Sequence, residues 1–249
     1  MDLQSALRTY SRIRKVFKAA RRSLNRSKTL SFLSQFIRHD DLVFDIGANV
    51  GDYTSLCLEL GAKVVAVEPQ PDCVKLLASR FQQNSNFELE TMALGNHRGV
   101  GLLYLSDVRS PISSMSMDWI KAVKESGRFR HFKWRQTQTV KLACLDDLIK
   151  KHGLPSFCKI DVEGYDHEVL CGLNSAIGKL SFEYHLEFFS KFESCIDRLS
   201  ELGAYTYNFT IGERPRLHLP LWVESSELLD TLRKLSYRTL QGDIYAKLK

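Results

Sequence analysis

Apolar and polar residues follow one another along the chain in blocks that are typical of proteins in which strands and helices alternate. Residues 42–47 and 63–68 are short apolar runs, which predict buried strands. Between them, a helix is expected to start near Val50 and to end by Gly61, and a second helix is expected over residues 70–83. Strands that alternate with helices in this way form a doubly wound parallel sheet, so the pattern predicts an α/β fold.

The alternation continues towards the C-terminus with additional short strands in the middle of the chain. A third strand is predicted over residues 87–94, and a turn at residues 95–99 leads to a strand at 100–105. We expect this last strand to join the main sheet as part of a hairpin. Later elements are strands at residues 138–142, from Phe157 onward and at 180–185, and helices at 145–151 and around Glu168.

Residues 106–135 interrupt this order. The segment is polar, and it is basic near its end, where aromatic side chains lie between Lys and Arg. A long segment inserted between central elements is expected to form a lid or a wall of the substrate site. The alternative is a solvated loop whose aromatic residues fill a small separate cluster.

Length and composition favour one large domain. With 249 residues, of which 44% are hydrophobic and 26% charged, the chain can form a full core with little room for a second domain. Its six cysteines form no C-x-x-C pair and have no zinc-ligand spacing, so we expect reduced thiols in a cytoplasmic protein. No signal peptide and no membrane-spanning segment are predicted.

The positive charge is concentrated at the N-terminus. Residues 1–30 contain nine Lys and Arg and one acidic residue, a net charge of +8, so the rest of the +6 chain carries −2. The body of the protein is therefore not expected to bind nucleic acid. Apolar residues at spacings of three and four predict an amphipathic helix, which divides the chain into an arm, residues 1–38, and a domain, residues 39–249.

Two interpretations of this basic arm remain open. Residues 1–28 could lie on an anionic membrane surface, which would make the protein peripheral to the membrane. The alternative is a helix that packs on the domain or against a second subunit of a homodimer, with its Lys and Arg in water.

A glycine turn follows the first predicted strand. Asp45, Gly47, Ala48, Asn49 and Gly51 belong to a D-x-G-x-x-x-G pattern at a strand, turn and helix start, the arrangement that holds nucleotide-like cofactors. Dinucleotide enzymes use G-x-G-x-x-G because an anionic pyrophosphate lies on the helix N-terminus. Here the carboxylate of Asp45 would repel a pyrophosphate and attract the cationic end of S-adenosylmethionine, so S-adenosylmethionine is favoured over NAD.

A second acidic residue supports an adenosine cofactor. Seventeen residues after Gly51, the next predicted strand ends at Glu68, directly before Pro69. An acidic residue at this place accepts hydrogen bonds from the two ribose hydroxyls. We therefore predict that Glu68 and Pro69 belong to the cofactor site.

Further acidic residues follow two later strands. The strand that begins at Phe157 ends on Asp161 and Glu163, and ligands of open α/β sheets bind at the carboxyl ends of strands. Alternation along the next strand directs Glu183 and His185 to one side. Three acidic groups and an imidazole are thus expected around one pocket.

The order of these motifs resembles the FkbM family of S-adenosylmethionine-dependent methyltransferases. The motifs are D-x-G-A-N-x-G, V-E-P, A-L-G, L-D-D-L, K-I-D-V-E-G-x-x-x-E-V-L-x-G and an F-E-x-H strand, and they cover roughly residues 43–209. The resemblance implies a Rossmann-like, seven-stranded class I methyltransferase sheet with helices on both faces. It also implies a final antiparallel hairpin, for which residues 204–211 and 240–248 are candidates, and a cofactor contact at Ala93 of the A-L-G motif.

The resemblance further implies an O-methyltransferase that acts on sugar hydroxyls of glycans, glycolipids or secondary metabolites. A hydroxyl needs a base to remove its proton, and His185 is preferred because an imidazole titrates near neutral pH. Asp161 is expected to contact the acceptor or to take the proton, and Glu163 to hold a neighbouring hydroxyl. Structural interpretations of the same residues are helix capping, a salt bridge to Lys159 and a core histidine.

Three other possibilities bear on function. Asp161, Glu163 and Glu183 are hard oxygen ligands of the kind that Mg²⁺ takes, but no asparagine lies beside them, so no catalytic metal is expected. The N/D-P-P-Y/F motif of base-modifying methyltransferases is absent from the segment after Ile160, which disfavours nucleobase substrates. A non-catalytic scaffold that binds S-adenosylmethionine, or a methyltransferase acting on a protein or another small molecule, is the alternative function.

Overall fold

The apolar runs form the centre of one parallel sheet in the computed structural model, which describes residues 25–106, 112–127, 129, 131–235 and 241–249. Strand β1 (Leu42–Ile46) pairs in parallel with β2 (Lys63–Val67) and with β7 (Phe157–Ile160). Four of the five residues of β1, and four of the five of β2, are buried. Strands covered on both faces bury consecutive residues, which explains why uninterrupted apolar runs mark them in the sequence.

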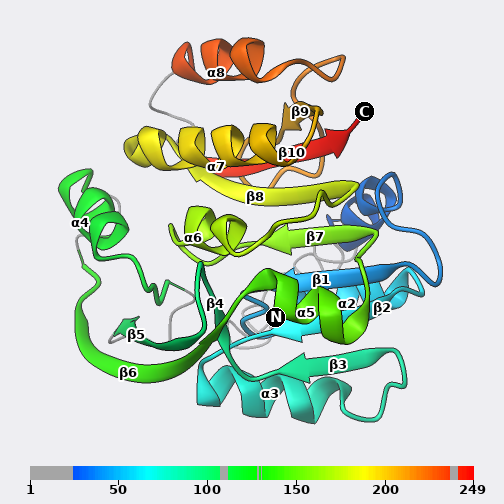
Figure 1. The fold of residues 1–249 in the computed structure, drawn as a ribbon, viewed down its shortest axis with the longest axis vertical. Helices are drawn as coiled ribbons and strands as arrows, with labels where there is room; N and C mark the ends of the chain where they lie inside the picture. Colours follow the sequence, from blue (N-terminus) through cyan, green and yellow to red (C-terminus); the bar gives the residue numbers. More distant parts are fainter. Residues whose placement is uncertain (1–24, 107–111, 128, 130, 236–240) are drawn as a thin grey trace, which may run out of the picture.

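Seven strands make up this sheet, in the order β3-β2-β1-β7-β8-β10-β9 (Figure 1). Strands β3 (Phe87–Glu90) and β8 (Lys179–His185) extend the parallel part on either side. Strand β10 (Gln241–Leu248) runs antiparallel between β8 and β9 (Tyr205–Phe209). The predicted seven-stranded sheet with two final strands in antiparallel pairing is confirmed.

Helices cover both faces of the sheet because alternate residues of each strand face opposite sides. Residues 25–33, α2 (Asp52–Glu59) and α3 (Pro71–Phe81) lie on the side of Val43, Val64 and Ala66. On the other side, the large core contains Phe44 and Ile46 with apolar residues of α5, α6 and α7. These three helices span Leu145–His152, Asp166–Cys171 and Phe189–Leu202, and the short helix η1 (Leu186–Phe188) and α8 (Ser225–Arg233) complete the C-terminal half.

The end of the predicted N-terminal arm packs on the domain. Phe32, Leu33, Phe36 and Ile37 are buried in one cluster with Tyr245 of β10, and the rings of Phe36 and Tyr245 stack with centroids 4.8 Å apart. Residues 1–24 lie outside the described part of the chain, so the membrane contact and the homodimer remain proposals. Among the described residues, no helix is long and apolar enough to cross a membrane.

The middle of the chain corrects two expectations. Residues 87–94 are not one strand: β3 ends at Glu90, and β4 (Ala93–Leu94) belongs to a second, three-stranded sheet. There β4 pairs with β6 (Trp134–Ala143), and β6 pairs with β5 (Gly99–Ser106), so residues 100–105 and 138–142 do not extend the main sheet. Two strands in different sheets have the same period as one long strand, so alternation alone could not separate them.

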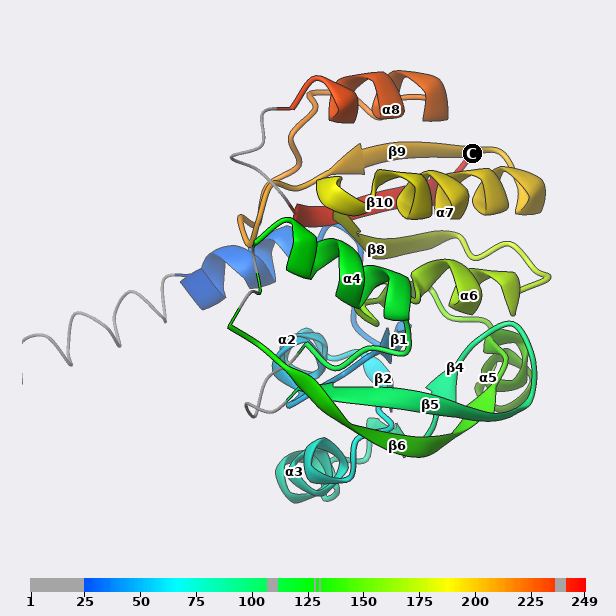
Figure 2. The ribbon, with the colours of Figure 1, turned by 90° about the vertical axis from the view of Figure 1, so that its left-hand side faces the viewer.

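The second sheet and the insertion lie across the carboxyl ends of the main strands (Figure 2). Within the described part of the insertion, Ser116 caps the N-terminus of α4 (Met117–Glu125). Its hydroxyl accepts a hydrogen bond from the backbone N–H of Trp119. Trp119 is fully buried and packs against the rings of Phe129 and Trp134. The aromatic residues therefore do fill a separate cluster, and this cluster anchors the insertion over the sheet.

Candidate functional site

The glycine turn after β1 depends on left-handed backbone conformations. Gly47 has φ +83°, and a Cβ atom there would lie 1.9 Å from the backbone oxygen of Asp161. Asn49 also has a positive φ, +50°. These conformations bring the turn against the loop after β7 and direct the backbone N–H of Asn49 towards Glu68.

Both oxygens of Glu68 are held by backbone donors. Its Oε2 accepts a hydrogen bond from the Asn49 N–H and its Oε1 accepts one from the Gln70 N–H, each at 2.8 Å. Burial raises the pKa of Glu68, and the two backbone donors act in the opposite direction. A carboxylate has about four acceptor positions, so this fixed group retains capacity for further hydroxyl donors.

A cavity extends from this turn to the ends of β7 and β4. The predicted residues on its wall are Gly47, Asn49, Glu68, Pro69, Ala93, Asp161 and Glu163. The remaining wall is mainly apolar and includes Met92, Leu94, Leu103 and Met115. Since Leu103 and Met115 come from the second sheet and the insertion, pattern reasoning on the main sheet did not identify them.

Three predicted cofactor residues lie behind this wall. Ala48 is buried against Leu77 of α3, and a Cβ atom at Gly51 would lie 2.6 Å from that Leu77 side chain. Asp45 points to the α2 side of β1, where its Oδ2 accepts a hydrogen bond of 2.6 Å from Thr54. Burial raises the pKa of Asp45, and its Oδ1 is buried without a partner. Direct binding of the cofactor by these three residues stays a prediction.

The insertion also reaches the cavity. Ser113 lines it and donates a hydrogen bond of 2.9 Å to the side-chain oxygen of Gln70, next to Glu68 and Pro69. This contact connects the insertion to the loop after β2. It supports the expectation that part of residues 106–135 forms a wall of the site.

Asp161 lies on the cavity wall beside a buried lysine. Lys159 Nζ donates a hydrogen bond of 2.6 Å to Asp161 Oδ2. Burial lowers the pKa of Lys159, but the negative charges of Asp161, Asp45 and Asp243 raise it by a larger amount. The net shift of this pKa is therefore upward. The predicted salt bridge between Lys159 and Asp161 is therefore present, and it fixes Asp161 at the cavity.

Glu163 has an unusual backbone conformation for a residue other than glycine. Its φ is +54°, and the following Gly164 has φ +82°. The Ser114 hydroxyl donates a hydrogen bond of 2.6 Å to the Glu163 carbonyl oxygen, and Trp119 packs so closely that a Cβ atom at Gly164 would lie 2.4 Å from it. Such strain, of about 1–3 kcal/mol, persists where surrounding contacts hold it and is common at functional sites.

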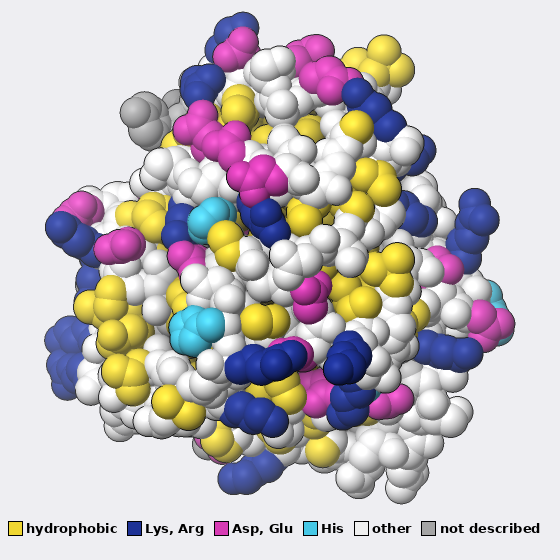
Figure 3. Space-filling model, viewed as in Figure 1, with side chains coloured by type: hydrophobic (Ala, Val, Ile, Leu, Met, Phe, Trp, Pro, Cys, Tyr) yellow, Lys and Arg dark blue, Asp and Glu magenta, His cyan; other side chains and the backbone are white. Residues whose placement is uncertain are grey.

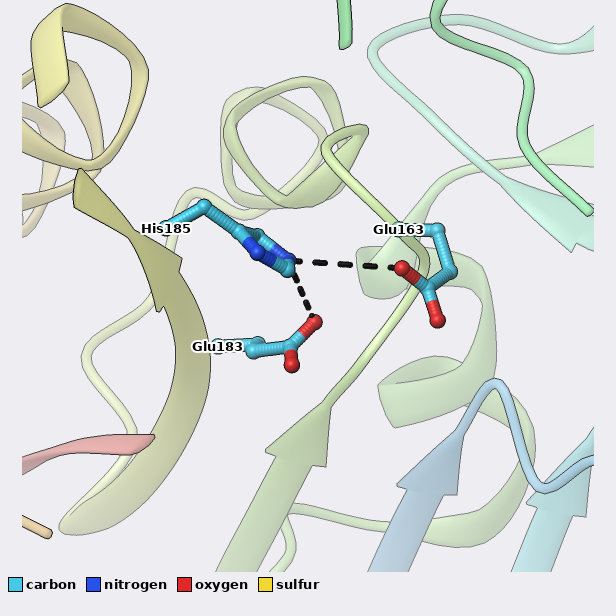
Figure 4. A group of neighbouring side chains, drawn as sticks. All are labelled: Glu163, Glu183 and His185. Atoms are coloured by element: carbon cyan, nitrogen blue, oxygen red, sulfur yellow. Dashed lines mark hydrogen bonds and ion pairs between the residues drawn. The ribbon is translucent and has the colours of Figure 1, made fainter. Parts of the chain in front are cut away.

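Glu183 and His185 meet Glu163 at the ends of β7 and β8 (Figure 4). His185 Nε2 is 2.8 Å from Glu183 Oε2 and 4.0 Å from Glu163 Oε2. The imidazole is buried and lies edge-on to Trp119, with ring centroids 5.6 Å apart. Glu163, Glu183 and His185 thus meet as predicted, but the four side chains do not share one pocket. Asp161 and Glu163 line the cavity described above, whereas Glu183 and His185 line a separate small one.

Two acidic residues near this group, the buried Asp166 and the half-buried Asp243, were not identified as site residues from the sequence. Burial, Asp161 and Glu183 raise the pKa of Asp166 to about 8. Burial raises the pKa of Asp243 to about 7; Lys159 opposes this increase, and Asp161 and Glu183 add to it. Asp243 lies opposite Glu183 in the β8 and β10 pair, and an acidic residue directly before the apolar run 244–246 is the signal that could have indicated it.

Comparison with known proteins adds the family to this geometry. Residues 45–239 match the family described as "Methyltransferase FkbM domain". The chain belongs to this family of methyltransferases. The match covers the glycine turn, Glu68, the second sheet, and Asp161, Glu163, Glu183 and His185 at the ends of β7 and β8, whereas Asp243 of β10 lies just beyond it.

Other comparisons are more distant. The FkbM chain is 27% identical over 156 residues to the hexuronic acid methyltransferase AglP of Haloferax volcanii; the alignment covers 61% of this chain and 58% of that protein. A precorrin-6y C5,15-methyltransferase structure from Geobacter metallireducens matches with a TM-score of 0.48 and 12% identity, over 90% of this chain and 87% of that one. A TehB-like methyltransferase structure from Corynebacterium glutamicum has a TM-score of 0.47 and 8% identity, over 94% and 97%.

Proposed function

We propose that this FkbM domain transfers a methyl group from S-adenosylmethionine to a hydroxyl oxygen of a sugar unit in a glycan or glycolipid. The observation that carries the proposal is the composition of the cavity wall. The wall contains the fixed carboxylate of Glu68 as well as Asp161 and Glu163. One cavity thus combines a carboxylate suited to ribose hydroxyls with carboxylates suited to an acceptor hydroxyl.

The residues present fit the cofactor. Glu68 retains acceptor capacity for two ribose hydroxyls, and Gly47 leaves room where any side chain would meet Asp161. The apolar side chains of Met92 and Leu103 provide a surface for a flat base. A cationic sulfur is favoured by the carboxylates of Asp161 and Glu163 on the same wall.

The chemistry assigns separate tasks to the acidic residues. When bound, S-adenosylmethionine supplies a methyl group on a cationic sulfur, and transfer forms a C–O bond as the C–S bond breaks with its electron pair left on sulfur. Asp161 lines the cavity, so it is best placed to accept the hydroxyl proton. Glu163 would accept a hydrogen bond from a neighbouring hydroxyl and so fix the acceptor, since positioning provides much of the rate of such a displacement. His185, the base preferred from the sequence, lies behind Glu163 and contacts Glu183 instead.

The sugar acceptor is supported by the relative that acts on a hexuronic acid, and by the several oxygen acceptors that face the cavity. The chain spans only 58% of the length of that relative, so a similar acceptor for this protein is part of the proposal.

Acidic and basic side chains are intermixed over the face shown in Figure 3. The absence of a nucleic-acid partner stays a prediction.

The test is a transfer assay with methyl-labelled S-adenosylmethionine and a cell extract separated into glycans, glycolipids, proteins and nucleic acids. We expect label in the glycan or glycolipid fraction that resists mild base, because a methyl ether is stable where a methyl ester is hydrolysed. Label in the protein fraction, or base-labile label, would overturn the proposed acceptor. Binding of S-adenosylhomocysteine without transfer to any fraction would support the scaffold instead.

A variant pair makes the assay specific for the site. Asp161→Asn is expected to lower transfer at least 100-fold while the affinity for S-adenosylhomocysteine remains within about threefold. Asp72→Asn removes an exposed carboxylate of α3 and should leave both quantities unchanged. Full activity of Asp161→Asn would place the proton acceptor elsewhere.

A further inference from the structure

Three side chains at the ends of β7 and β8 converge on one point. Glu163, Glu183 and His185 each present a ligand atom, and these atoms lie within 4.8 Å of one another. Figure 4 shows that Glu163 reaches the group from the loop after β7, while Glu183 and His185 reach it from β8. Two carboxylate oxygens and an imidazole nitrogen at these separations are a donor set for a divalent cation.

A further carboxyl group borders Glu183 and His185 by an independent observation. Asp166 lines a small cavity together with Glu183 and His185. Its side chain is buried, with 4% of the residue exposed, and its Oδ1 has no hydrogen-bond partner. A buried carboxylate oxygen without a partner is costly, and a bound cation would satisfy it.

The neighbouring lysines are engaged elsewhere. Lys159 donates to Asp161, and Lys191, which lines the same small cavity, pairs with Glu168. In the described part of the chain, neither lysine forms a salt bridge with Glu163, Glu183 or Asp166, so neither takes the place of a cation between these carboxyl groups.

We propose that Glu163, Glu183 and His185, with Asp166 as a further oxygen donor, bind one divalent cation beside the acceptor end of the cavity. The proposal departs from the sequence-based expectation of no metal, which rested on the lack of an asparagine partner. In the structure, the imidazole of His185 supplies a ligand atom in place of an asparagine side chain. Mn²⁺ is a suitable probe for this site because carboxylates are among its preferred ligands.

The location gives the cation a role that rests on the proposed function. Glu163 belongs both to the cation group and to the cofactor cavity wall, so the ion would lie within reach of an acceptor oxygen. A divalent cation makes a bound hydroxyl easier to deprotonate and fixes its orientation. This would assist the weak base Asp161, and it assigns His185 to metal binding rather than to proton transfer.

The direct test is binding of Mn²⁺ to the full-length, EDTA-treated protein, followed by the electron paramagnetic resonance signal of free Mn²⁺. We expect about one Mn²⁺ per chain, and at least a tenfold loss of affinity in Glu183→Gln and in His185→Gln. The control is His152→Gln, which removes another buried histidine that pairs with a glutamate, Glu90, and should leave Mn²⁺ binding unchanged. Circular dichroism and thermal unfolding verify that each variant is folded.

Two results would overturn the cation site: no binding of Mn²⁺ at millimolar concentration, or equal affinities in the wild-type protein and both cluster variants. Transfer assays separate this outcome from failure of the proposed function. We expect EDTA to abolish methyl transfer, Mn²⁺ to restore it, and the affinity for S-adenosylhomocysteine to stay within about threefold throughout. Transfer that persists in EDTA would remove the cation's role and leave the proposed function standing. Specific Mn²⁺ binding without transfer to any acceptor would support the cation site and contradict the proposed function.

Discussion

At the scale of single residues, the left-handed backbone of Gly47 and Glu163 determines what faces the cavity. Gly47 lets the turn after β1 touch the backbone of Asp161, and Glu163 is turned towards His185 in a conformation that glycine adopts more readily. The insertion holds this second conformation through Ser114 and Trp119. The loops after β1 and β7, which both line the cavity, thus constrain each other's backbone conformation.

Gly47→Ala is expected to be strongly destabilising because it combines a strained φ with a direct clash. We expect a loss of about 3 kcal/mol in the free energy of unfolding, measured with urea. Gly127→Ala is the matched control: Gly127 has φ +79°, and a Cβ atom there would meet nothing within 4 Å. It should cost only about 1 kcal/mol of backbone strain. Equal losses for the two variants would show that the contact with Asp161 does not matter.

Glu68→Gln tests the proposed binding of the ribose hydroxyls by Glu68. Both oxygens of Glu68 accept from backbone N–H groups, so an amide would place a donor against a donor and would remove the negative charge. We expect a 10- to 100-fold loss of affinity for S-adenosylhomocysteine by calorimetry, with Asp72→Asn as the exposed control. An unchanged affinity would contradict the position assigned to the adenosine.

At the scale of elements, α5 shows how a helix start is stabilised away from the site. Asp147 accepts a hydrogen bond of 3.0 Å from the backbone N–H of Cys144, the residue that precedes the helix, and pairs with Arg98. The hydrogen bonds from Arg98 and Cys144 lower the pKa of Asp147 from 3.8 to about 2. The pairing connects α5 to the turn before β5, so it also fixes the second sheet.

Asp147→Asn should therefore destabilise the protein in a pH-dependent manner. The pKa of Asp147 is lower in the folded state than in the unfolded state, so its contribution is complete above about pH 4 and disappears as the pH falls towards 2. Because Arg98 is largely exposed, we expect about 1 kcal/mol at pH 7. Urea unfolding of both proteins at pH 7 and pH 3 checks this; a difference that grows at pH 3 would contradict it.

At the scale of the whole molecule, the segment before β1 completes one face of the sheet. Phe32 and Phe36 pack on Tyr245, which belongs to the last strand, so the two ends of the described chain meet in one cluster. The folded domain therefore includes at least the last part of the predicted arm.

Phe36→Ala tests this packing. Phe36 is 4% exposed, and truncation of a buried phenylalanine leaves a cavity, so we expect a loss of about 3–4 kcal/mol in the free energy of unfolding. Leu221→Ala removes an exposed apolar side chain, 73% exposed, and should change stability by less than about 0.5 kcal/mol. Similar effects of the two substitutions would mean that residues 25–37 contribute little to the core.

The sequence by itself determined the main sheet and the order of its motifs. Buried parallel strands appear as apolar runs, and Asp161, Glu183 and His185 follow or end such runs, so their place at the carboxyl edge was predictable. Glu68 was predictable for the same reason. These are local signals, because the period and the end of a strand are encoded in neighbouring residues.

Only the tertiary structure decided which of these residues meet. The second sheet pairs β4 and β5 with β6, which follows only after the insertion, and it brings Leu103 to the cavity beside Met115 of the insertion. The side of β1 on which Asp45 lies, the contact of Trp119 with His185, and the grouping of Asp166 with Glu183 depend on how layers pack. Such contacts follow from three-dimensional packing, which a pattern along the chain does not specify.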